Sequence, residues 1–261
     1  MHTIDLRFLN LPKYQISKEN FKQLSATSPR RLRFFDKQAD PIRISNADGT
    51  YVAFVNVKFK ETIGCILQAV DNSIRIFLNK HGFGIGLANQ DIVNKVAEFI
   101  HNFNRLVFLK SLLGSMVALD MNFESNREEY TDIGRHEHLA KESQDNDSLL
   151  HIASKLTEVI QELPFYRDAD CIMAIPPTTG KDHCFPRDLA HLVAGQSDIP
   201  DYSSCLTFIA KHASLKDLPI DEKWQALVNS NLEVAQQEAI QGKTVILLDD
   251  LYQSGTTVHF V

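Results

Sequence analysis

The residues best suited to chemistry lie close together near the end of the sequence. Asp249 and Asp250 follow an apolar run from Val245 to Leu248, and a turn of small polar residues, Ser254 to Thr257, comes shortly after them. Gly255 lets the backbone turn tightly, and the hydroxyl and backbone N–H groups of such a turn can surround a phosphate. Because carboxylates repel a phosphate, two acids beside it make sense if they bind sugar hydroxyls or a magnesium ion that a diphosphate also holds.

The apolar run before these acids predicts a buried parallel strand. Short runs of aliphatic residues are typical of strands that are covered on both faces of a sheet. In an open α/β sheet, ligands bind beyond the carboxyl ends of the strands, where Asp249 and Asp250 stand. The alternative is an ordinary core strand with a capped turn, which does not account for both the acid pair and the turn of Ser254 to Thr257.

A second stretch repeats the order of strand and polar loop. Asp170 to Ile175 predicts another buried strand, a small polar loop from Pro176 to Lys181 follows it, and a helix is expected over Arg187 to Ala194. We expect both strands to end on the same edge of a sheet. Backbone N–H groups and a lysine in such a loop suit a diphosphate. A surface turn explains this segment equally well on its own, and the distant turn at Ser254 favours the diphosphate.

The segment VILLDDLYQSGTT, residues 245–257, resembles the signature of type I phosphoribosyltransferases, in which two acids and a T/S-G-x-T turn follow an apolar strand. The resemblance implies a doubly wound, mostly parallel, Rossmann-like α/β domain over residues 122–261. It implies that Asp249 and Asp250 are catalytic, bind the ribose of phosphoribosyl pyrophosphate (PRPP) and hold Mg²⁺ directly or indirectly. It further implies that the PRPP phosphates are bound by Thr178, Thr179, Gly180, Lys181, Ser254, Gly255, Thr256 and Thr257.

Residues after Asp201 resemble the mobile hood of the same family, nearest to the branch of the competence protein ComF. A strand is expected over Ser204 to Ala210 and a helix over Asp221 to Val228, with a charged loop between them. The resemblance implies that Lys211 or Lys216 acts in catalysis from this hood. ComF proteins usually carry arginines here and often open with a zinc ribbon, whereas this chain has lysines and no cysteine pairs. A solvated charged loop is the alternative.

Composition places the chain among ordinary globular proteins. Its 261 residues, 44% of them hydrophobic and 23% charged, fit one large domain or two modest ones. A formal net charge of −6 excludes a global basic field for nucleic acid. The scattered cysteines, without a CxxC pair, and the lack of a signal-peptide pattern predict a cytoplasmic protein with reduced thiols. The longest apolar stretch, Leu106 to Leu119, is too short to span a bilayer.

Residues 1–121 predict a β-rich region of unknown role. Asp48-Gly49 signals a turn between strands at Ile42 to Ile44 and Tyr51 to Val55, which makes a hairpin. Two more strands are expected, over Cys65 to Ala69 and Ser73 to Leu78.

The glycines from Gly82 to Gly86 precede a helix that is expected over Asp91 to Phe103. Their G-x-G-x-G spacing departs from the dinucleotide fingerprint, which favours a glycine-rich turn over a nucleotide loop.

The polar stretch from Asn122 to Asp147 predicts a linker or exposed loop. His136 and His138 within it are a weak metal signal, because no third ligand is near in the sequence, and solvent-exposed histidines are the favoured interpretation. After this stretch, Asp147 is expected to cap an amphipathic helix that Pro164 ends.

Two functions remain open. The first is a phosphoribosyltransferase that uses Mg²⁺ and transfers phosphoribose to or from a nucleobase-type acceptor. The second is a non-catalytic PRPP-fold binding or regulatory protein, linked to nucleic-acid handling as in ComF proteins. The expected partners are PRPP and a nucleobase-type small molecule. A homodimer stays open, nucleic acid is not indicated by the charge, and no membrane is expected.

The helix that the Ser254 turn would open has only Val258 to Val261 after it. In the family this helix covers the sheet and leads to at least one more strand. We therefore expect the natural reading frame to continue by about one helix and one strand, roughly 20–30 residues at typical element lengths.

Overall fold

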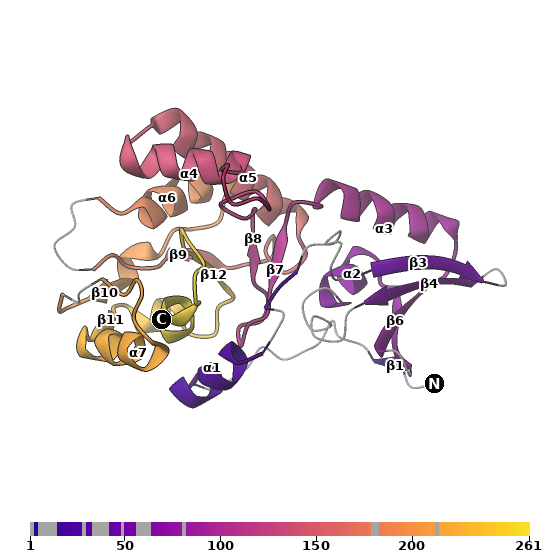
Figure 1. Ribbon diagram of the computed structural model, residues 1–261, viewed down its shortest axis with the longest axis horizontal. Coiled ribbons are helices and arrows are strands. Elements are labelled where there is room, and N and C mark those ends of the chain that lie inside the picture. The colour runs from indigo at the N-terminus through magenta and orange to yellow at the C-terminus, as the bar shows by residue number, and fades with distance from the viewer. Residues whose placement is uncertain are drawn as a thin grey trace. The chain divides into compact units, whose positions relative to one another are not determined.

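The computed structural model describes residues 3–4, 15–27, 30–32, 42–47, 50–55, 64–79, 82–178, 183–211 and 214–261. They form a mixed α/β structure with small sheets, which divides into two compact units (Figure 1). Unit 1 comprises Met1–Gln15 and Ala26–Asp120, and unit 2 comprises Ile16–Ser25 and Met121–Val261. Within the described residues, every helix is too short or too polar to cross a membrane.

Unit 1 is built on an antiparallel five-stranded sheet of order β1-β5-β6-β4-β3. Its strands are β1 (Thr3–Ile4), β3 (Ile42–Ala47), β4 (Thr50–Val55), β5 (Arg75–Asn79) and β6 (Gly82–Leu87). The predicted hairpin of β3 and β4 is confirmed, with Ile42 opposite Val55 and Ala47 opposite Thr50. The turn residues Asp48 and Gly49 themselves lie outside the described residues.

A smaller sheet of unit 1 has the order β2-β7-β8, with β2 at Arg31–Leu32, β7 at Val107–Leu109 and β8 at Val117–Ala118. The predicted helix is present as α3, Gln90–Asn102, and the side chain of Asn89 caps it by accepting from the N–H of Ile92. Its apolar stripe is buried as the helical spacing predicted: Ile92, Val96, Phe99 and Ile100.

Two predictions for unit 1 are wrong. Cys65–Val70 forms helix α2 and not a strand, because a short apolar run suits either element when it is buried on several sides. Ile66 and Leu67 are fully buried in it. Gly82–Leu87 forms strand β6 and not a turn: Gly84 lies opposite Phe77, and a Cβ on Gly84 would overlap the Phe77 ring. The glycine makes room for an aromatic side chain within the sheet.

Unit 2 contains the parallel strand pair that the sequence predicted. Strand β9, Cys171–Ala174, pairs in parallel with β12, Val245–Leu248, and Ala174 lies opposite Leu248 (Figure 1). The prediction that both strands end on one edge of a sheet is therefore confirmed. Ile172 also forms a parallel bridge with Asp201 on the other side of β9. All residues of β9 are buried, as expected for a strand covered on both faces.

Helices cover this pair in layers. Helix α6 (Phe185–Ser197) packs on β9, α5 (Asn146–Glu162) packs on α6, and α4 (Asp132–Glu142) packs on α5 (Figure 1). The other elements are α1 (Lys18–Ser25), η3 (Ser203–Cys205), β10 (Leu206–Phe208), α7 (Ile220–Asn229), β11 (Leu232–Val234), α8 (Gln237–Ile240) and α9 (Thr256–Phe260). Strands β10 and β11 form an antiparallel pair of their own.

Helix α4 corrects the prediction of a linker over Asn122 to Asp147. Thr131 caps it by accepting from the N–H of Gly134 (3.0 Å), and the helix buries only the small residues Gly134 and Ala140. A Cβ on Gly134 would overlap the backbone of Asn122, so the helix docks by close backbone approach. Such docking leaves no apolar stripe in the sequence.

The prediction that Asp147 caps the next helix, α5, is wrong. The side chain of Asp145 caps it by accepting from the N–H of Ser148.

Helix α1 comes from the first residues of the chain but packs within unit 2. Phe21 is fully buried, with its ring centroid 6.0 Å from that of Trp224 on α7 and 4.8 Å from that of His259 on α9. Lys22 adds an ion pair with Asp221 (2.8 Å). Helix α1 therefore packs against both α7, which carries Lys223, and α9, which begins within the Ser254 turn.

Candidate functional site

The two acids stand just beyond the paired ends of β9 and β12. The N–H of Ile175 donates to the carbonyl oxygen of Leu248 (2.8 Å), so pairing continues to the last residue of β12. Asp249 and Asp250 then leave the sheet beside the loop that begins at Pro176. The sheet thus places both carboxylates where ligands bind in open α/β folds.

The turn after the acids has a backbone conformation that favours glycine. Gly255 has φ +78°, and a Cβ at this position would lie 2.5 Å from the ring of Tyr252. Ser254 Oγ and Thr256 Oγ1 are 2.8 Å apart. Nδ1 of the buried His259 donates to the carbonyl oxygen of Gly255 (2.7 Å). These contacts fix the hydroxyl groups of the turn before any ligand is present.

The turn encloses a depression of about 80 Å³ that a lysine also lines. The lining residues are Leu215, Lys223, Asp249, Leu251, Gln253, Ser254, Gly255, Thr256 and Thr257. Lys223, on α7, is only 9% exposed. Within the described part of the chain, the structure records no hydrogen bond or ion pair of its side chain, and the lysine lines the depression. A cation placed here without a carboxylate partner suits an anion in the depression.

A second lysine neutralises Asp250 from the neighbouring helix layer. Lys141, on α4, has its Nζ 2.6 Å from Oδ2 of Asp250 and 2.6 Å from Oε1 of Glu137. The same Nζ lies 5.6 Å from the ring centroid of Phe185. Burial lowers the pKa of Lys141, but its two carboxylate partners raise that pKa further, and the net shift is upward. Lys141 is therefore a firmly charged partner for Asp250.

Asp249 has the opposite electrostatic environment. Loss of hydration, followed by the negative charge of Asp250, raises the pKa of Asp249 to about 7. The N–H of Asp250 donates to Oδ1 of Asp249 (2.9 Å), and the charge of Lys141 also opposes the shift. Protein atoms crowd this carboxyl although the residue as a whole remains exposed, so water offsets part of the desolvation. The negative charge of an ionised Asp249 is therefore only partly neutralised, by the more distant Lys141.

The raised pKa of Asp249 predicts how stability depends on pH. The unfolded chain loses this proton near the ordinary value of 3.8, whereas the folded chain keeps it to a higher pH, at most about 7. Relative to Asp249→Asn, the free energy of unfolding of the unchanged protein should fall as the pH rises between these values and then level off. Urea denaturation of both proteins across this range measures the difference. A difference that is flat or rises with pH would contradict the shift.

The other residues that the sequence predicted for the site differ in whether the structure describes them and in whether they line the depression. Thr178 is half-buried in the loop after β9, while Thr179, Gly180 and Lys181 lie outside the described residues. Lys211 and Lys216 are exposed, and neither lines the depression, whereas Leu215 does. Lys223, on α7, is the lysine of this region that lines it.

The sequence does not indicate Lys141, because it predicts a linker where α4 forms. The spacing of Glu137 and Lys141 is that of a helical ion pair, which was the available signal. Nothing in the sequence connects either residue with Asp250.

The interpretation of His136 and His138 as solvent-exposed is only half right. His138 is exposed and stacks on Tyr130, with ring centroids 5.2 Å apart. His136 is 22% exposed and its Nδ1 hydrogen-bonds to Ser148 Oγ (2.9 Å). The two histidines do not share a site.

Comparison of the chain with protein-family models, with curated proteins and with solved structures found no match.

Proposed function

We propose that this chain binds PRPP with Mg²⁺ at the common edge of β9 and β12 and transfers phosphoribose to or from a nucleobase-type acceptor. One observation carries the proposal: Asp249, the Gly255 turn and the buried Lys223 line one depression beyond the end of a parallel strand. This joins sugar-binding acids to anion-binding groups in the order that the resemblance to type I phosphoribosyltransferases implies.

The depression suits one phosphate group of the ligand. Its volume of about 80 Å³ is far below the ~300–1,000 Å³ that encloses whole small molecules, so the rest of the ligand would extend along the sheet edge. Hydroxyl groups of Ser254, Thr256 and Thr257 can donate to phosphate oxygens, and Lys223 adds a charge-assisted hydrogen bond. The 5′-phosphate of PRPP is the group that we assign here.

The acid pair would then face the ribose and the diphosphate. Asp249 and Asp250 fit Mg²⁺ because the ion prefers carboxylate oxygens together with phosphate oxygens, and because no cation of the described residues forms an ion pair with Asp249. Bound there, Mg²⁺ would neutralise charge on the leaving diphosphate. Lys141 holds Asp250 in place from α4.

Displacement of pyrophosphate at the anomeric carbon passes through an oxocarbenium-like state, in which the bond to pyrophosphate breaks as the acceptor nitrogen approaches. Such a reaction needs little covalent chemistry from the protein. It needs oriented reactants, charges placed around the leaving group and exclusion of water. The segment from β10 to α7 brings Leu215 and Lys223 to the depression, so it is suited to cover the ligand.

Lys223→Gln is expected to weaken the binding of PRPP by about 10- to 100-fold, because one charge-assisted hydrogen bond contributes ~1.5–3 kcal/mol. Because the Lys223 side chain forms no ion pair within the described residues, its replacement should leave the thermal stability nearly unchanged. Calorimetry and thermal melts of the variant, beside the exposed control Lys155→Gln, separate the two effects. Equal affinities of the two variants would count against Lys223 as a ligand.

The function is tested by incubating the full chain with PRPP, Mg²⁺ and a panel of nucleobases, and by measuring released pyrophosphate. Release that depends on one base supports the transferase. PRPP binding without release on any base would favour the non-catalytic binding protein. Failure to bind PRPP at all would overturn the proposal.

A further inference from the structure

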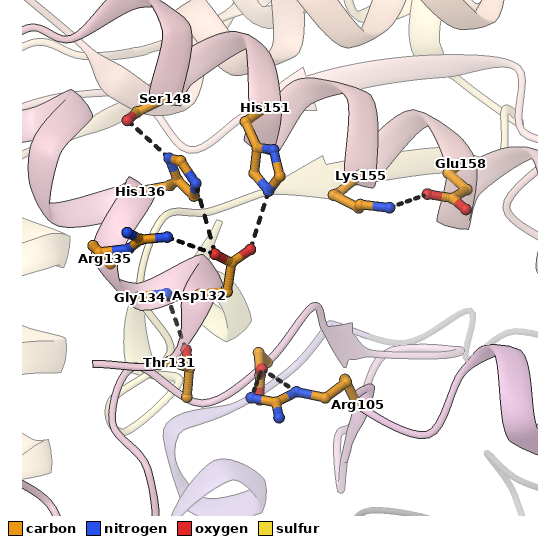
Figure 2. Close-up of polar contacts among 11 residues, drawn as sticks. Arg105, Thr131, Asp132, Gly134, Arg135, His136, Ser148, His151, Lys155 and Glu158 are labelled. Carbon is orange, nitrogen blue, oxygen red and sulfur yellow. Dashed lines mark hydrogen bonds and ion pairs between the residues drawn. The ribbon is translucent and has the colours of Figure 1, made fainter. Parts of the chain in front are cut away.

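Helices α4 and α5 bring together three side chains that are typical metal ligands. Asp132 Oδ1 lies 3.8 Å from Nε2 of His136, and Asp132 Oδ2 lies 3.2 Å from Nε2 of His151. One potential ligand atom from each residue lies within 4.8 Å of the others. Figure 2 shows the Nε2 atoms of both imidazoles directed at the Asp132 carboxylate, with α4 supplying two ligands and α5 the third.

A buried serine fixes the orientation of one imidazole. Nδ1 of His136 hydrogen-bonds to Ser148 Oγ (2.9 Å), and Ser148 is 1% exposed (Figure 2). The N–H of Ser148 in turn donates to Asp145 Oδ2 (2.9 Å), at the cap of α5. This contact leaves Nε2 of His136 available on the side of Asp132. Metal-binding histidines are commonly held in this way through their other ring nitrogen.

The two imidazoles are also close to one another. Their ring centroids are 4.1 Å apart and their planes differ by 27°. Protonated rings at this distance would repel each other, whereas neutral rings can both bind one ion. The side chains are 58% exposed for Asp132, 35% for His151 and 22% for His136, so an ion can enter from solvent.

We propose that Asp132, His136 and His151 bind a divalent transition-metal ion, with Zn²⁺ as the representative case. Imidazole nitrogen with one carboxylate suits Zn²⁺, Cu²⁺ or Ni²⁺ better than Mg²⁺ or Ca²⁺. Zinc bonds of ~2.0–2.2 Å at tetrahedral angles place ligand atoms about 3.3 Å apart. The two imidazole nitrogens lie 3.2 and 3.8 Å from the two oxygens of Asp132, and one ligand atom from each residue lies within 4.8 Å of the others. Rotation of these partly exposed side chains would bring the three ligand atoms to the separation that zinc requires. Water would complete the coordination, and the ion would link α4 to α5.

Arg135 competes with the ion for Asp132. Its NH2 group lies 2.9 Å from Asp132 Oδ1, and both side chains are more than half exposed (Figure 2). Exposed ion pairs of this kind contribute little free energy, so a metal ion can displace the guanidinium. Removal of this competing charge in Arg135→Gln should therefore strengthen the binding of the metal ion.

The test is titration of Zn²⁺, and separately Co²⁺, into the full chain after treatment with a chelator. One equivalent should bind, and the Co²⁺ form should show absorption bands of nitrogen and oxygen coordination. His136→Gln and His151→Gln should each weaken Zn²⁺ binding by more than tenfold, and Ser148→Ala by about 10- to 100-fold. Arg135→Gln should bind Zn²⁺ more tightly than the unchanged chain.

The matched control is His138→Gln, which removes a histidine of the same helix that stacks on Tyr130 outside the cluster. It should bind Zn²⁺ like the unchanged chain and show the same rise in melting temperature on addition of Zn²⁺. The proposal is overturned if His138→Gln loses Zn²⁺ as His136→Gln does, or if the unchanged chain binds no more tightly than His136→Gln. Arg135→Gln keeps all three proposed ligands, so it tests the site even if a ligand variant folds poorly. Unchanged or weaker binding of Zn²⁺ by Arg135→Gln would contradict the proposal.

Discussion

Replacing both acids, Asp249→Asn together with Asp250→Asn, is expected to weaken the binding of PRPP with Mg²⁺ at least a hundredfold. Each carboxylate would lose a charge-assisted hydrogen bond worth ~1.5–3 kcal/mol, and the pair would lose its attraction for the metal ion. Isothermal calorimetry with PRPP, in the presence and absence of Mg²⁺, measures the loss. Both substitutions keep the shape of the side chains, so the effect reports on charge.

The effect must be distinguished from a general change in charge or stability. Glu128→Gln with Glu129→Gln neutralises two adjacent acids that are exposed and distant in sequence from the turn, and it should bind PRPP like the unchanged chain. Lys141 keeps Glu137 as a partner when Asp250 is neutralised, so the double variant should still fold. A folded double variant that binds like its parent would remove the assignment of the acids to the ligand.

Gly255→Ala is expected to weaken phosphate and PRPP binding strongly, because a Cβ strains the backbone of the turn and overlaps the Tyr252 ring. A left-handed backbone costs a residue other than glycine about 1–2 kcal/mol. At Gly255 the Cβ would also lie 2.5 Å from the Tyr252 ring, so the ring or the turn must move. Displaced hydroxyl groups no longer meet a phosphate together, and we expect a loss of affinity larger than that of Lys223→Gln.

The chain offers a matched control for this substitution. Gly242 has φ +76°, nearly the same as Gly255, but no atom lies within 4 Å of the position of its Cβ. Gly242→Ala should therefore show the backbone cost alone, as a fall in stability of about 1–2 kcal/mol, with PRPP binding unchanged. Chemical denaturation and calorimetry of both variants make the comparison. Equal affinity in the two alanine variants would show that the Gly255 turn does not hold the phosphate.

The elements that depend on local pattern were predictable from the sequence. The apolar run Val245–Leu248 forms a strand with the predicted bounds, and β9 and α3 lie within a residue or two of their expected positions. Burial patterns of this kind repeat over a few residues, so each segment carries its own signal. The acid pair and the Gly255 turn were predictable for the same reason, because they follow a recognisable strand directly.

The wrong predictions have a common physical cause. Gly84 belongs in a strand because the Phe77 ring lies opposite it, and α4 forms where Gly134 lets its backbone approach Asn122. The apolar run Cys65–Val70 is compatible with a strand or a helix, and it forms a helix whose side chains Ile66 and Leu67 are fully buried. In each case the deciding contact comes from a residue outside the segment, and local propensity is too weak a preference to overcome it.

By itself, the sequence determined that Asp249, Asp250 and the Gly255 turn stand at the end of a strand, because these features are neighbours along the chain. It did not determine that only Ile246 and Leu248 of this strand are buried. Only the tertiary structure decided which charges meet them: Lys141 reaches Asp250 from α4, and Lys223 is buried at the turn from α7. It also paired His136 with His151 instead of His138. Electrostatic and ligand contacts depend on distance in space, and the packing of α4, α5 and α7 sets those distances independently of separation in sequence.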